Sequence, residues 1–136
     1  MRKKIDSNRS ATMRAVTSKN TKPELAVRSL IHRLGFRFRL HRKDIPGNPD
    51  IAFPCRRKVI FINGCFWHGH DCTRGARVPI NNRDYWTVKI ARNKARDARH
   101  LVALAASGWQ ALTLWECELR DQHLQERIKA FLTLYP

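Results

Sequence analysis

The spacing of apolar residues predicts a helix close to the start of the chain. Thr21 and Glu24 have the spacing of a capping box, and Pro23 lies near the first helical turn. Apolar residues then recur at helical spacing before Gly35: Val27, Leu30, Ile31 and Leu34. This pattern predicts a helix that buries one face.

Four further segments have the pattern of strands. Apolar and basic residues alternate over 36–40, as in a half-buried strand, and a Pro/Gly turn leads into a second strand at 50–53. The run 59–62 is apolar on both faces, which suits a central strand. Residues 109–115 are almost entirely apolar and complete the predicted sheet.

Two more helical patterns complete the chain. One runs from about Asp84 to Ser107 and ends before Gly108. The other carries four apolar residues at helical spacing: Leu124, Ile128, Phe131 and Leu132. The order α, β, β, β, α, β, α predicts an α/β fold in which helices flank a mixed sheet. With 136 residues, the chain is expected to form one domain over 1–136.

The charge of the chain indicates which class of partner it binds. There are 27 Lys and Arg against 11 Asp and Glu, a formal net charge of +16, and the basic residues run from Arg2 to Lys129. A compact body of this charge attracts polyanions, of which nucleic acid is the usual one. The alternative is a protein that is merely soluble and very basic.

The N-terminal segment bears on location and on contacts. No stretch is apolar for long enough to cross a bilayer, and the first residues lack the apolar core of a signal peptide, so we expect a cytoplasmic protein. Residues 1–20 are polar and basic without a sustained period. They are interpreted as a flexible arm that contacts DNA, or as simple terminal disorder.

A cluster of metal-ligand residue types follows the central strand. Cys65, His70 and Cys72 lie within eight residues, and Cys117 ends the last strand. Three thiolates and one imidazole favour tetrahedral Zn²⁺, and a closed set of four is structural. The alternative is buried cysteines with a surface histidine. Cys55 has no suitably spaced partner and is interpreted as an ordinary free thiol.

Asp50 is a candidate metal ligand of another kind. It follows Pro49 at the start of a strand, where a carboxylate projects from the end of a sheet. Mg²⁺ prefers one or two carboxylates together with waters and phosphate oxygens. The alternative is an ordinary turn residue.

The long helix carries polar residues on a face that should pack on the sheet. One stripe contains Trp86, Ile90, Asn93, Asp97, Leu101 and Leu104. A carboxylate there is costly unless it is paired, and His68, near the end of the central strand, is a natural partner for Asp97. A purely structural Asp–Arg or Asp–His pair is the alternative.

Aromatic residues close to these candidates allow two interpretations. Phe66 and Trp67 lie between a candidate zinc ligand and His68, and Trp86 follows a polar loop. They are either core residues or, in so basic a protein, surfaces that stack on bases or wedge between them. Trp109 and Trp115, on an apolar strand, are expected in the core.

An ordered set of motifs is more specific than any of these features alone. It comprises Pro46-Gly47-x-Pro49-Asp50, the run from Val59 to Cys72, the stretch from Val78-Pro79 through Tyr85-Trp86 to Asn93-x-x-Arg96-Asp97, and Gly108-Trp109 to Trp115-Glu116-Cys117. The set resembles the very-short-patch-repair (Vsr) DNA mismatch endonucleases over nearly the whole chain, from Met13 to Cys117.

That resemblance implies a restriction-endonuclease-like fold and a Mg²⁺-dependent nick on the 5′ side of the thymine in a T:G mismatch, which arises when 5-methylcytosine deaminates. It implies Asp50 as the metal-binding carboxylate, with the backbone carbonyl of Ile62 as a further ligand. His68, oriented by Asp97, would be the general base or a partner to the attacking water. Glu24 falls at a position associated with the active site.

The resemblance also assigns the cysteines, the aromatics and the partners. The structural zinc maps onto the set already reached from ligand chemistry: Cys65, His70, Cys72 and Cys117. Three residues match the aromatics that wedge into DNA beside the mismatch: Phe66, Trp67 and Trp86. The implied partners are duplex DNA with a T:G mismatch and a MutL-type mismatch-repair protein, and the implied enzyme is a nucleoid-associated monomer.

Two departures from the family pattern affect the active site. Some members have Thr-His where this chain has Ile62-Asn63, so Asn63 takes over any role of the histidine side chain or that role is lost. There is also no acid-x-Lys after the strand, so waters and DNA phosphates must fill the metal shell. Two competing functions remain: a restriction-type endonuclease of the same fold, and a zinc-stabilised DNA-binding module without catalysis.

Overall fold

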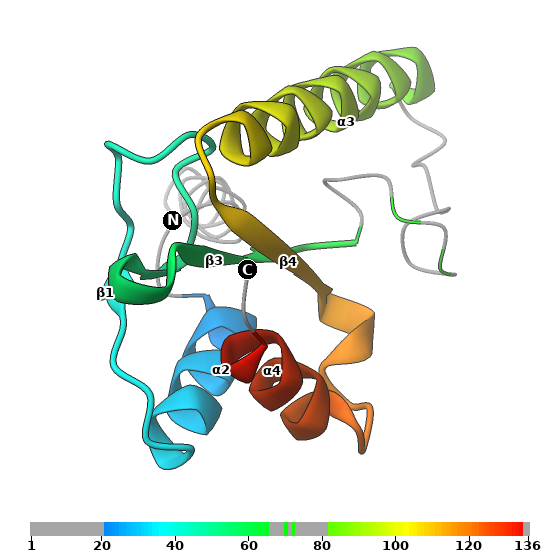
Figure 1. The fold of residues 1–136 in the computed structure, drawn as a ribbon. Coiled ribbons are helices and arrows are strands. Elements are labelled where there is room, and N and C mark those ends of the chain that lie inside the picture. The colour runs from blue at the N-terminus through cyan, green and yellow to red at the C-terminus, as the bar shows by residue number, and fades with distance from the viewer. Residues whose placement is uncertain (1–20, 66–69, 71, 73–81, 135–136) are drawn as a thin grey trace, which may run out of the picture.

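A mixed sheet forms the centre of the protein (Figure 1). The computed structural model describes residues 21–65, 70, 72 and 82–134. Its four strands follow the order β1-β2-β3-β4, with bounds Arg39–Leu40, Ile51–Phe53, Lys58–Asn63 and Gln110–Trp115. The pairs β1–β2 and β2–β3 are antiparallel, whereas β3 and β4 are parallel, with Lys58 opposite Gln110 and Asn63 opposite Trp115. The predicted mixed sheet with a central apolar strand is confirmed.

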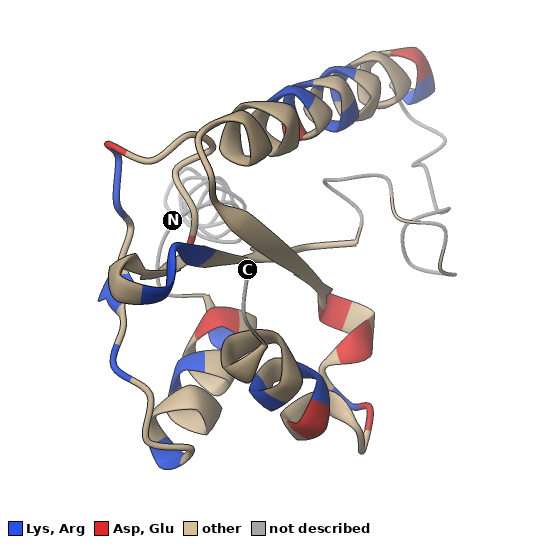
Figure 2. Ribbon diagram, in the orientation of Figure 1, with Lys and Arg blue, Asp and Glu red and all other residues tan. Residues whose placement is uncertain are grey.

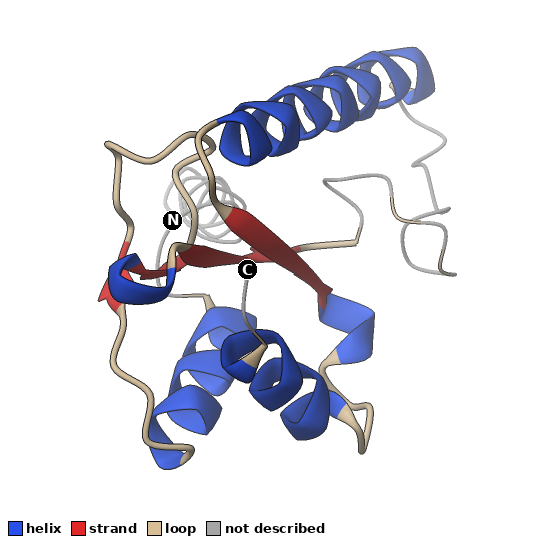
Figure 3. Cartoon of the chain, viewed as in Figure 1, coloured by secondary structure: helices blue, strands red, loops and turns tan. Residues whose placement is uncertain are grey.

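Helices cover both faces of this sheet (Figure 3). Helix α2 spans Lys22–Arg33, α3 spans Arg83–Ala106 and α4 spans Leu124–Thr133. Short 3₁₀ turns, η1 at Pro54–Arg56 and η2 at Glu116–Glu118, follow β2 and β4. In the described part of the chain, no helix has the length and apolarity that spanning a membrane requires.

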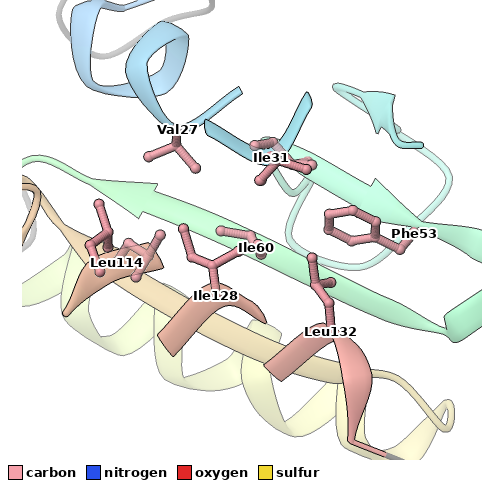
Figure 4. Packing of buried hydrophobic residues seen from close by; sticks show 9 residues of the cluster. Val27, Ile31, Phe53, Ile60, Leu114, Ile128 and Leu132 are labelled. Atoms are coloured by element: carbon pink, nitrogen blue, oxygen red, sulfur yellow. The ribbon is translucent and has the colours of Figure 1, made fainter. Parts of the chain in front are cut away.

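Side chains along each strand point alternately to the two faces of the sheet, and each face forms its own hydrophobic core. One face contacts α2 and α4, and Figure 4 shows the side chains that meet there: Val27, Ile31, Phe53, Ile60, Leu114, Ile128 and Leu132. The other face is smaller, and Ala52 and Val59 lie there against Leu104 of α3, with Trp109 packed alongside. Because successive strand residues point to opposite faces, one β-hairpin supplies both cores.

Three details differ from the expectations. The strand expected over 36–40 is reduced to Arg39–Leu40, although Phe36 and Phe38 still pack against the core. On α3, the assignment of Leu101 to the core-facing stripe was wrong: its exposed fraction is 42%, and His100 is the half-buried residue at that level. The capping box is half formed, since Thr21 accepts from the Glu24 N–H while the Glu24 side chain turns elsewhere.

Candidate functional site

Both candidate metal clusters lie at the carboxyl end of β3. Parallel pairing of β3 with β4 places the ends of the two strands at the same edge, with Asn63 opposite Trp115. Cys65 and Cys117 each follow their strand by two residues, so this register brings together cysteines that are far apart in the sequence. The parallel ladder therefore explains why Cys117 joins the cluster.

The four predicted zinc residues converge on one point. The ligand atoms of Cys65, His70, Cys72 and Cys117 all lie within 4.8 Å of one another. The Cys117 Sγ lies 3.5 Å from Nδ1 of His70, and the Cys117 N–H donates to the Cys65 Sγ over 3.4 Å. Three sulfurs and one imidazole at this separation fit a tetrahedral zinc by donor chemistry and by number.

Trp115 and the backbone orient this cluster. The His70 ring stacks on Trp115, with centroids 4.2 Å apart and planes 11° apart, and the backbone N–H of His70 donates to the Cys65 carbonyl over 3.0 Å. Burial raises the pKa of the Cys65 thiol from 9.0 to about 12 without a metal. At neutral pH this thiol is therefore protonated, and a bound metal has to displace its proton.

A second cluster lies where β2 begins. The Asp50 Oδ2 accepts a hydrogen bond of 2.7 Å from the Ile62 N–H, which holds the carboxylate against β3. Glu24, His41 and Asp50 place one ligand atom each within 4.8 Å of one another. Of the predicted active-site residues, Glu24 and Asp50 are thus brought together from two elements that are distant in sequence.

His41 and Arg28 are the functional candidates that the sequence reasoning missed. Glu24 is buried, with an exposed fraction of 1%. It forms an ion pair with Arg28 and contacts His41, whose Nε2 lies 3.2 Å from Oε2 of Glu24. The sequence does contain a signal for Arg28: it follows Glu24 by four residues on a helix, a spacing at which opposite charges pair. His41 was not detectable by spacing, since only the sheet brings it to α2.

The predicted polar positions on α3 are half-buried, as the stripe requires. Asn93 and Asp97 are both of intermediate exposure, and Oδ1 of Asp97 lies 3.4 Å from a terminal guanidinium nitrogen of Arg96. At the start of the helix, Trp86 contacts the ring of Tyr85 edge-on at 5.0 Å, and the Lys89 ammonium lies 5.8 Å from each ring centroid. An aromatic pair beside a cation suits contact with stacked bases.

Several predicted residues lie outside the described part of the chain. They are Phe66, Trp67, His68 and the arm over 1–20. The pairing of Asp97 with His68 and the wedging aromatics therefore stay predictions. Ile62 contacts Asp50 through its N–H, while the role of its carbonyl as a ligand also stays a prediction. Asn63 is nearly buried at the end of β3, with an exposed fraction of 9%.

Comparison with known proteins gives consistent matches. A family model described as "DNA mismatch endonuclease Vsr" matches residues 3–74. A "Type II nicking enzyme V.XorIIP" of Xanthomonas oryzae pv. oryzae is 60% identical over 109 residues, which are 80% of this chain and 79% of that protein. "Type II nicking enzyme V.NmeAIP" of Neisseria meningitidis is 41% identical, over 90% of this chain and 87% of its own length. "DNA mismatch endonuclease Vsr" of Escherichia coli is 38% identical, over 91% and 83% respectively.

Proposed function

The chain belongs to the DNA mismatch endonuclease Vsr family, and from that premise we propose that it nicks one strand of duplex DNA on the 5′ side of the thymine in a T:G mismatch. Membership makes it a DNA endonuclease, a hydrolase of phosphodiester bonds, with the restriction-endonuclease-like fold of the family. The observation that carries the proposal is the convergence of Glu24 and Asp50 at the end of the central strand.

Asp50 and Glu24 are the side chains that would hold Mg²⁺. Two carboxylates together with waters and phosphate oxygens form the donor set that this ion prefers, and the carbonyl of Ile62 is a further proposed ligand. When bound, Mg²⁺ polarises the scissile phosphate and stabilises negative charge on the leaving oxygen. The Ile62 N–H orients Asp50 for this role, because its hydrogen bond fixes one carboxylate oxygen.

Proton transfer in this proposal falls to His68, oriented by Asp97. An imidazole with an ordinary pKa near neutrality can accept a proton from the attacking water, and a carboxylate beside it fixes the ring and its tautomer. Asp97 suits this task because it is half-buried on the face of α3 that packs on the sheet. Asn63, nearly buried between the two clusters, would orient groups at the same edge through its amide.

The cysteine cluster would act as a structural zinc clamp that aims the active-site loop. Cys65 and His70 flank 66–69, so a zinc on both residues fixes the two ends of a four-residue segment. The donor set supports this role because it is complete with four ligands and leaves no position open for chemistry. In this proposal His68 would face the phosphate, and Phe66 and Trp67 would face the bases.

Mismatch preference would come from the energy needed to open the duplex. Phe66, Trp67 and Trp86 are the proposed wedges, and inserting such side chains costs a few kcal/mol of unstacking, least where the pairing is weak. A T:G wobble pair is therefore easier to open than a Watson–Crick pair. The proposal also includes a monomer that acts in the nucleoid with a MutL-type partner.

A nicking assay tests this function. Duplexes that carry T:G, C:G or T:A at one position should be nicked only at T:G, on the thymine strand, with Mg²⁺ present. Asp50→Asn and His68→Ala should abolish nicking and leave DNA affinity largely unchanged. Equal cleavage of the three duplexes, or cleavage of both strands, would indicate a restriction-type enzyme. Binding without any nicking by the wild-type protein would indicate a DNA-binding module.

A further inference from the structure

We infer that Arg28 and His41 are positioning residues of the active site: together they hold the buried Glu24 carboxylate beside Asp50. The inference rests on the proposed function, since it takes Asp50 as the metal-binding carboxylate. It goes further by assigning roles to two residues that the family motifs quoted above do not include.

The Glu24 carboxylate is buried and needs partners. With an exposed fraction of 1%, its carboxylate has left the solvent, which is unfavourable unless charges and donors compensate. Arg28 and His41 both contact the same oxygen, Oε2. The Arg28 guanidinium also lies 3.3 Å from Nε2 of His41, so the three side chains form a closed triangle.

His41 is also connected to Asp50 through the backbone. The His41 N–H donates to the Asp50 carbonyl over 3.3 Å, at the point where the β1–β2 ladder ends. His41 adopts φ of 51°, in the left-handed region that non-glycine residues rarely occupy. Such a conformation is strained and persists where the surroundings enforce it, often at functional sites. Here it turns the imidazole toward α2.

The two carboxylates come from separate elements of the fold. Glu24 comes from the first turn of α2 and Asp50 from the start of β2, so neither element alone fixes their separation. His41 contacts Glu24 with its ring and Asp50 with its backbone, and Arg28 fixes Glu24 from its own helix. Arg28 and His41 thus set the distance between the Glu24 and Asp50 carboxylates, which must bind one ion.

The test measures metal affinity directly, with Mn²⁺ as the probe. Mn²⁺ binding to the DNA-free protein is followed by electron paramagnetic resonance, and the Mg²⁺ concentration for half-maximal nicking is measured in parallel. Removing the groups that orient metal ligands typically costs 10- to 100-fold in metal affinity. His41→Ala and Arg28→Ala should therefore raise the dissociation constant for Mn²⁺ and the Mg²⁺ concentration for half-maximal nicking, each by about 10- to 100-fold. His41→Gln, which retains a donor to Glu24, should recover most of the loss.

Matched controls lie on the same helix. His32→Ala and Arg33→Ala remove exposed residues from the last turn of α2 and should leave metal affinity unchanged. DNA affinity in the absence of metal, and the thermal midpoint of His41→Gln, should also stay close to wild type. These two readouts separate a positioning role from loss of the fold.

Two results would overturn the positioning role. One is an unchanged Mn²⁺ affinity in both His41→Ala and Arg28→Ala. The other is an imidazole-nitrogen coupling to bound Mn²⁺ that disappears in His41→Gln, because His41 would then be a ligand. Asp50→Ala separates this from failure of the proposed function: if it binds Mn²⁺ as well as wild type does, the proposed metal site itself is wrong.

Discussion

At the residue scale, buried charges in this protein are placed where they satisfy backbone or carboxylate groups. Lys58 is an example on the opposite end of β3 from the candidate site. Its exposed fraction is 1%, and its ammonium donates to the carbonyls of Phe131 and Leu134 at the end of α4. Burial, and secondarily the charge of Arg56, lowers the pKa of Lys58 below its ordinary value. The ammonium thus caps carbonyls that a helix end leaves without intrahelical partners.

Replacing Lys58 by methionine should therefore destabilise the protein. Methionine keeps most of the apolar stem but leaves partly buried carbonyls without a donor, which costs about 1 to 3 kcal/mol. The free energy of unfolding, measured with urea, should fall by that amount. Lys129→Met, at an exposed position on α4, is the control and should change stability by less than about 0.5 kcal/mol. Equal effects of the two substitutions would contradict the capping role.

Gly47 allows a second test at single-residue resolution. Its φ is 84°, and a Cβ would lie 3.0 Å from Cζ of Phe61 and 3.1 Å from Cβ of His100. Gly35 has a similar φ of 89°, but a Cβ there would meet nothing within 4 Å. Gly35→Ala should thus show only the backbone cost, about 1 kcal/mol. Gly47→Ala should cost about 1 to 3 kcal/mol more, because overpacking adds to it. Thermal unfolding of the two variants checks the difference.

At the scale of elements, the end of β3 links the two candidate metal clusters. Ile62 contacts Asp50, Asn63 is nearly buried, and Cys65 belongs to the sulfur cluster, all within four consecutive residues. A change that loosens the cysteine cluster is therefore transmitted to the carboxylate cluster through a very short segment. This coupling predicts that zinc supports catalysis without taking part in it.

Cys117→Ala tests the coupling. Bound zinc, measured by atomic absorption, should fall from about one per chain to none, because a structural site needs its four ligands. Stability and nicking should fall with it, while Asp50 is left intact. Cys55→Ala removes an exposed free cysteine outside the cluster and should change neither zinc content nor activity. A full zinc content in Cys117→Ala would remove Cys117 from the site.

The same cluster predicts how the metal-free protein responds to pH. In the folded state the pKa of Cys65 is about 12, against 9.0 for an ordinary thiol. Above pH 9 the unfolded chain loses this proton while the folded chain keeps it, so folding stability falls as pH rises toward 12. Urea unfolding of chelator-treated protein at pH 8 and pH 10 should show the fall. The fall should shrink in Cys65→Ala and in zinc-loaded protein, where the ligand is already a thiolate.

The elements show how far sequence reasoning reaches. The spacing of apolar residues, together with turn residues, was sufficient to predict α2, β3, α3 and α4, because local patterns determine each of these elements. Local patterns failed to predict side-chain positions that depend on tertiary packing. His100 rather than Leu101 faces inward on α3, since it packs beside Gly47, which belongs to a distant turn. Glu24 leaves its own helix cap for His41, a contact that exists only once the sheet has formed. Metal-ligand chemistry, by contrast, found the set containing Cys117 without knowledge of the fold.

At the scale of the whole molecule, the net charge of +16 is shared unevenly between the two helical layers. Figure 2 shows basic residues along α3, while on the other side of the sheet η2 carries the acidic residues Glu116 and Glu118. Lys89, Arg92, Arg96 and Arg99 follow one another at helical spacing on α3, next to the stripe that contains Trp86. This basic row is the surface that we expect to follow the DNA backbone.

Salt dependence of DNA binding distinguishes this surface from the general charge of the protein. Each phosphate contact contributes about 0.9 to the slope of log affinity against log salt. Arg92→Gln with Arg99→Gln should therefore lower the slope by about 2, whereas Arg33→Gln with Lys129→Gln, which removes the same net charge from α2 and α4, should leave it nearly unchanged. Fluorescence anisotropy without Mg²⁺ measures both. The preference for T:G over C:G should persist in both double variants, because phosphate contacts carry little sequence information. Equal losses of slope would mean that the whole basic surface, and not α3, attracts the DNA.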